Sequence, residues 1–135
     1  MTRRARPPSG WPPPDRALLR GAEIELAPLA EAIADRYFGE FPEDLERYGD
    51  DVARAWELHD TRHLLNWAVN DVEGLADLHG QVTWLARILE ARGFPLEHLA
   101  RNLQLAADVL AERVDDGADV AERLRAAAHG VRTSS

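Results

Sequence analysis

The chain has 135 residues and a formal net charge of −8 at pH 7. This length suits one domain that buries about two thirds of its unfolded surface, so folding needs no metal or disulfide. The chain has no cysteine, which excludes disulfide scaffolds, thiolate zinc sites, iron–sulfur clusters and cysteine nucleophiles. There is no long apolar run typical of a membrane span and no recognisable signal peptide, so we expect a cytoplasmic protein.

The charge is distributed unevenly along the chain. Residues 1–20 hold five arginines against the single acid Asp15, which leaves the remaining chain more acidic than the whole. An acidic body repels phosphate backbones and argues against nucleic-acid binding. Residues 1–14 are rich in Pro and Arg and are expected to form a disordered arm, although Trp11 could pack back on the body. We expect a helical domain over residues 15–131 and a disordered tail over 132–135.

The first half of this domain has apolar residues at helical spacing. Such a stripe runs from Ala22 to Phe41 and is interrupted by Pro28, which either kinks the helix or opens its second half. Gly39 and Pro42 then break the chain. Gly49, followed by Asp50 and Asp51, indicates the start of another helix. This long helix should continue to about residue 72.

The second half shows three further stripes. The first is Leu75, Leu78, Val82, Leu85 and Leu89, which ends at the strong stop Gly93-Phe94-Pro95. The next runs from Leu96 to Leu110, and Gly117 separates a last helix from it. No alternating strand pattern competes anywhere. The sequence therefore predicts an all-α, single-domain fold of five to six helices, either a bundle or a globin-like packing.

The long helix at 52–72 has two apolar faces. On a helical wheel Leu58, Leu65, Val69 and Val72 form an aliphatic face for the core. Roughly opposite lies a second face, with Tyr48 in line if the helix extends that far; its members are Tyr48, Trp56, His59, His63 and Trp67. Large aromatic residues at helical spacing are more often part of a core or a dimer interface; the alternative is that this face lines a ligand pocket or a partner-binding site. We take these five residues as the candidate site.

Catalytic and metal chemistry find little support in the sequence. His59 and His63, four residues apart, could reach one metal ion, but two ligands do not make a site. Asp60 stands where a His-Glu-x-x-His zinc enzyme needs Glu, and a second acid-x-x-His half of a di-iron site is missing. His79, His98 and His129 are scattered and expected to be exposed. We therefore predict no enzyme, no metal site and no catalytic residues.

A resemblance to a known class of domain begins at residue 41. It rests on Phe41-Pro-Glu-Asp-Leu-Glu-Arg-Tyr-Gly49, Asp60-Thr-Arg-His63-Leu-Leu65, Trp84-Leu85, Leu89, Arg92-Gly-Phe-Pro95 and Asn102-Leu103. This order resembles bacterial helical sensor and regulatory domains, namely those beside cobalamin-binding domains and the globin-like sensor domains of stressosome scaffold proteins. The resemblance implies a dimeric sensory or interaction module without catalysis. Leu78 and Gln81 stand where that pattern has aromatic residues, so any ligand pocket here differs from the pattern or is absent.

These observations favour a non-catalytic regulatory, sensory or protein-interaction domain. We expect a homodimer or a bound ligand, since the second face of the helix at 52–72 is too apolar to leave in water. A signalling protein is a further expected partner, with no membrane or nucleic acid involved. The alternative is a haem- or tetrapyrrole-binding globin-like protein that uses His63 or His59 as its axial ligand; otherwise we predict no cofactor.

Overall fold

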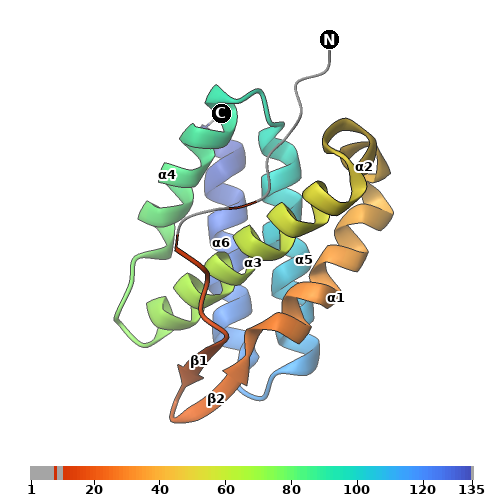
Figure 1. Ribbon diagram of the computed structural model, residues 1–135. Coiled ribbons are helices and arrows are strands. Elements are labelled where there is room, and N and C mark those ends of the chain that lie inside the picture. Colours follow the sequence, from red (N-terminus) through yellow and green to blue (C-terminus); the bar gives the residue numbers. More distant parts are fainter. Residues whose placement is uncertain (1–7, 9–10, 135) are drawn as a thin grey trace.

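The computed structural model describes residue 8 and residues 11–134 and is built almost entirely of helices (Figure 1). In the described part of the chain the helices are α1 (Leu26–Glu40), α2 (Pro42–Tyr48), α3 (Asp50–Val72), α4 (Leu78–Ala91), α5 (Leu96–Arg113) and α6 (Gly117–Ser134). The prediction of an all-α fold is confirmed, with its upper count of six helices within these residues. No helix among them has the length and apolar character needed to cross a membrane.

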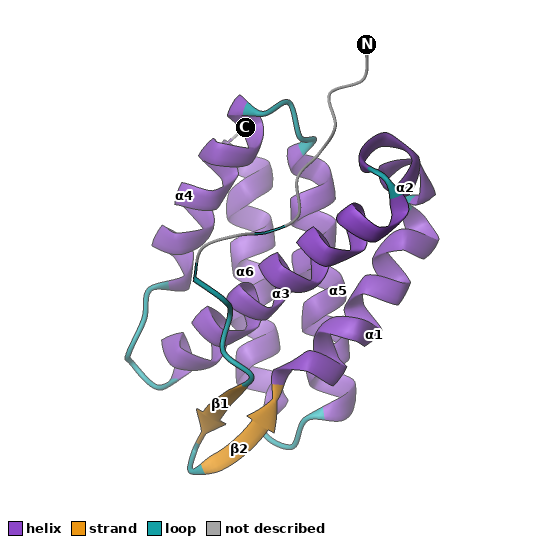
Figure 2. Ribbon diagram, viewed as in Figure 1, coloured by secondary structure: helices purple, strands orange, loops and turns teal. Residues whose placement is uncertain are grey.

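A short β-hairpin precedes α1 and was not expected from the sequence (Figure 2). Strands β1 (Arg16–Leu19) and β2 (Ala22–Glu25) pair antiparallel with Ala17 opposite Ile24. Arg20 and Gly21 form the turn with φ of 50° and 84°, the signature of a tight hairpin turn. Ala17 and Ile24 point into the core, whereas Leu18 is exposed. Ala22, assigned above to a helical stripe, therefore lies in a strand, and α1 begins only at Leu26.

The breaks in the chain lie close to the residues that the sequence indicated. Pro28 stands in the first turn of α1, where its missing N–H costs nothing. Pro42 opens α2 after α1 ends at Glu40. Gly49, with φ of 88°, separates α2 from α3. Leu75 is the first residue of the apolar stripe expected before Gly93. It precedes α4 and is 78% exposed, so it does not belong to the core.

Helices α5 and α6 pack side by side behind α3, while α1 and α4 flank them (Figure 1). The core between these helices is aliphatic, and Leu64, Leu65, Leu103, Leu110 and Leu124 are each at most 1% exposed. Arg132, expected in a disordered tail, is part of α6 and its guanidinium bonds Glu97 of α5. This ion pair fixes the last turn of α6 against the body; Ser135 lies outside the described residues.

Candidate functional site

Four rings of α3 follow one another along the helix. Trp56 contacts His59 with ring centroids 5.6 Å apart, His59 contacts His63 at 4.8 Å, and His63 stacks on Trp67 at 5.6 Å with an interplanar angle of 27°. We call these four residues the aromatic ladder. Spacings of three and four residues place their side chains on one side of a helix. All four rings are half-buried. The structure thus brings together four of the five site residues expected from the sequence.

The ladder is not the face of α3 that forms the core. The core face consists of Ala53, Thr61, Leu64, Leu65, Ala68 and Val69. The predicted aliphatic face was therefore partly wrong: Leu65 and Val69 are buried, but Leu58 and Val72 are only half-buried. The centre of the buried face therefore lies closer to Leu64 than the helical wheel predicts.

Tyr48 does not belong to the ladder. Gly49 ends α2, so the helix that carries the ladder does not extend back to Tyr48. The Tyr48 ring lies instead against Phe94, with centroids 6.5 Å apart, and beneath the Arg47 guanidinium. The fifth expected site residue is therefore held on a different helix.

Residues 11–15 lie along α3 next to the ladder, and we call them the strap. Arg62 Nη2 donates to the carbonyl oxygens of Pro13 and Pro14 at 3.0 and 3.1 Å and meets Asp15 Oδ1 at 2.6 Å. The Trp11 main chain lies near the rings of both His59 and His63, where it favours their protonated forms. The strap falls within the expected disordered arm, yet these contacts hold it on α3; residues 1–7 and 9–10 of that arm lie outside the described residues.

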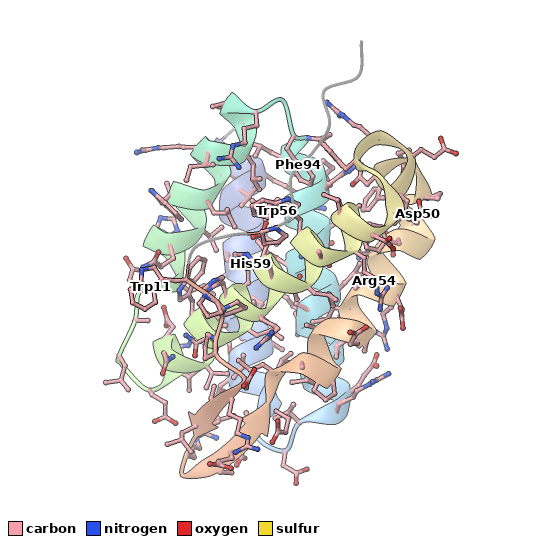
Figure 3. All side chains as sticks on the ribbon, in the orientation of Figure 1. Trp11, Asp50, Arg54, Trp56, His59 and Phe94 are labelled. Carbon is pink, nitrogen blue, oxygen red and sulfur yellow. The ribbon has the colours of Figure 1, made fainter. Side chains whose placement is uncertain are left out.

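Parts of the strap and parts of the ladder are accessible to solvent. Pro13 is buried, whereas the Trp11 side chain is 90% exposed. In Figure 3, Trp56 and His59 lie on the part of α3 turned toward the viewer, and Trp11 lies to their left. The second face of α3 is thus covered by a short segment of the same chain, and it is not interior core.

The two histidines of the ladder differ electrostatically. The Asp60 carboxylate, 3.1 Å from His59 Nδ1, raises the pKa of His59. Burial, together with the neighbouring His59, lowers the pKa of His63. As pH falls, His59 should therefore gain its proton before His63, and the charge of the ladder changes in two steps.

A second polar cluster lies inside the protein, where α1, α2 and α5 meet. Asp44 is 4% exposed and its Oδ2 accepts a hydrogen bond from the Tyr37 hydroxyl. The same Oδ2 lies 3.0 Å from His98 Nδ1. Phe41 stacks on the His98 ring with centroids 3.9 Å apart. Burial, and then the bond to Asp44, raises the pKa of Tyr37 far above its usual value.

This cluster continues into α3 through a buried glutamate. Asn102 Nδ2 donates to Thr61 Oγ1 at 3.1 Å, and the Thr61 side chain hydrogen-bonds Glu57. Burial raises the pKa of Glu57 well above its usual value, and nearby Asp44 adds to the shift. Within the described part of the chain, Glu57 Oε2 and Asn102 Oδ1 are buried without a hydrogen-bond partner.

Sequence reasoning missed this cluster for identifiable reasons. His98 was expected to be exposed, but Asp44 holds it half-buried; His79 and His129 are exposed as expected. Asp44 follows Pro42 in the first turn of α2, where acidic residues are common, so its place in the sequence does not mark it as a buried group. The available signal was the residue pattern that carries the family resemblance, since it includes Asp44, Thr61 and Asn102.

The residues of the two clusters described above include no serine or cysteine. Asp44 and His98 make an acid–histidine pair, but the chain has no cysteine and its serines are confined to positions 9, 134 and 135. In residue 8 and residues 11–134, no three or more acidic or histidine side chains gather as a metal site would require.

Comparison with known proteins adds nothing to these observations. No family model, curated protein or solved structure matches this chain.

Proposed function

We propose that this protein is a non-catalytic regulatory domain that binds a protein partner through the aromatic ladder of α3. The observation that carries the proposal is the position of the ladder, on the side of α3 where the strap lies and not on the core face. Rings used only for packing would be expected on the core face. Here His59 and His63 are half-buried beside a strap whose Trp11 is 90% exposed.

The chemistry of the ladder suits a protein partner. Aromatic side chains bury large areas for little conformational entropy, and histidine adds a polar tip whose charge depends on pH. Trp67 packs partly against the core, so the ladder is supported from beneath. A partner that covers these rings gains apolar burial without having to reorganise the helices.

The test compares the wild type with His63→Ala by thermal unfolding, light scattering and visible absorption. Under the proposal the protein is colourless, and the substitution costs about 1 kcal/mol or less, since it removes a half-buried ring whose ring contacts are with His59 and Trp67. The expected homodimer is tested at the same time: if a second copy is the partner, His63→Ala shifts light scattering toward the monomer.

Leu64→Ala is the matched control on the same helix. Leu64 is 1% exposed, so its truncation should cost about 2–5 kcal/mol through lost transfer energy and a cavity. A loss of similar size in His63→Ala, with no change in assembly, would show that His63 is a packing residue. A haem absorption band in the purified protein would favour the tetrapyrrole alternative instead.

A further inference from the structure

The strap that covers the ladder has an unusual composition. It reads Trp11-Pro12-Pro13-Pro14-Asp15, three consecutive prolines between an aromatic residue and an acid. Proline fixes φ and lacks an N–H, so such a run is extended and has no regular main-chain hydrogen bonds of its own. These carbonyls must be bound by the surroundings or by water.

Arg62 binds two of these carbonyls. Its Nη2 donates to Pro13 O at 3.0 Å and to Pro14 O at 3.1 Å, and it also pairs with the Asp15 carboxylate. The ladder beside Arg62 places the imidazole rings of His59 and His63 near the Trp11 main chain. Aromatic-lined surfaces that bind main-chain carbonyls are the general means by which proteins recognise preformed proline-rich segments.

We propose that the aromatic ladder together with Arg62 is a binding site for an extended proline-rich segment of another protein, and that the strap occupies this site as an internal competing ligand. This inference rests on the proposed function and specifies the chemistry of the partner. The preferred ligand has consecutive prolines followed by an acidic residue, because Asp15 completes the contacts of Arg62 in the strap.

The strap is held in a way that permits exchange. Its ion pair with Arg62 involves an Asp15 side chain that is 87% exposed, and such pairs contribute little to stability. An intramolecular ligand still competes strongly because its effective concentration is high. The apparent affinity for an external segment is therefore reduced by the fraction of molecules in which the strap is bound.

The experiment uses a fluorescently labelled peptide, Trp-Pro-Pro-Pro-Asp, and fluorescence anisotropy with the full chain. Pro13→Gly combined with Pro14→Gly frees the strap backbone and should raise peptide affinity about tenfold or more over the wild type. Arg62→Ala should abolish peptide binding both in the otherwise wild-type chain and in the double glycine variant. Arg125→Ala is the control, because Arg125 is an exposed α6 arginine that pairs with Asp108. A peptide with glycine in place of each proline should not bind.

Thermal melts show whether the double glycine variant folds. If it does not, Asp15→Ala gives the same comparison, since it removes only the exposed carboxylate and should raise affinity by a smaller factor. The proposal is overturned if strap-loosened protein binds the peptide no better than the wild type, or if Arg62→Ala leaves affinity unchanged. Peptide-independent dimers in the loosened variant would also overturn it, in favour of strap exchange between two copies.

The two proposals fail in different ways. If the peptide does not bind but His63→Ala is as stable as expected, the proline-rich ligand is wrong and the ladder can still be a surface for another protein partner. A large loss of stability in His63→Ala rejects the surface itself.

Discussion

Replacing Glu57 by Gln should stabilise the protein at neutral pH, although it removes a buried functional group. The Glu57 carboxyl is buried and bonded to Thr61, and its Oε2 has no partner among the described residues. Gln has nearly the same shape and keeps an oxygen that can accept from Thr61. It also carries an amide group that can donate a hydrogen bond, which a carboxylate cannot do.

The magnitude follows from two contributions. A buried polar atom without a partner costs about 1–3 kcal/mol, which sets the gain expected from Glu57→Gln near pH 7–8. The second contribution depends on pH. Burial raises the pKa of Glu57 in the folded state, so the folded protein holds this proton more tightly than the unfolded chain does. The stability that this proton provides is complete below the unfolded pKa and is lost as pH rises toward the folded pKa.

The assay is denaturant unfolding of both proteins from pH 4 to pH 8. The difference in unfolding free energy, Glu57→Gln minus wild type, should grow with pH by up to about 1.4 kcal/mol per pH unit over the affected window. Glu97→Gln is the control of opposite sign, because Arg132 lowers the pKa of exposed Glu97. Parallel curves for the wild type and Glu57→Gln between pH 5 and 8 would refute the reasoning.

Four further substitutions test the packing by thermal or denaturant unfolding. Leu103→Ala, at a site that is 0% exposed, should cost about 2–5 kcal/mol, and a loss below about 1 kcal/mol would mean that this part of the core is loosely packed. Gly39→Ala should stabilise α1 by about 0.5–1 kcal/mol, because a Cβ there meets nothing within 4 Å. Gly117→Ala should instead destabilise by about 1–3 kcal/mol, since its Cβ would lie 2.2 Å from the Leu110 carbonyl oxygen; equal effects at the two glycines would contradict this. Tyr37→Phe leaves buried Asp44 with one donor fewer and should cost about 1–3 kcal/mol, whereas a neutral result would show that water replaces the hydroxyl.

The helices could be predicted because their signals are local. Gly49 with Asp50 and Asp51 indicated the start of α3, and Gly93 with Pro95 indicated the gap before α5. The hairpin was missed because its strands are four residues each and Ala22 happens to match the helical spacing of α1. The decisive feature, positive φ at both Arg20 and Gly21, is a property of the folded backbone.

The candidate site was predictable in part for the same reason. The ladder lies on one helix, so the spacing of Trp56, His59, His63 and Trp67 was sufficient to find it. The buried cluster joins Asp44 to His98 across a separation of 54 residues, which no local pattern encodes. The strap depends on Arg62 meeting Pro13 and Pro14, a contact that arises only once α3 is packed in the fold.

The way Arg62 holds the strap also bears on how freely its sequence can change. Arg62 donates to main-chain carbonyl oxygens, a group that every amino acid carries. Substitutions in residues 11–15 that keep the backbone extended should therefore have little effect on this contact. Arg62→Lys should weaken it, because an ammonium group lacks the planar fork of the guanidinium. Among relatives we expect the side chains of residues 11–15 to diverge faster than position 62, with proline content outlasting any particular order of residues.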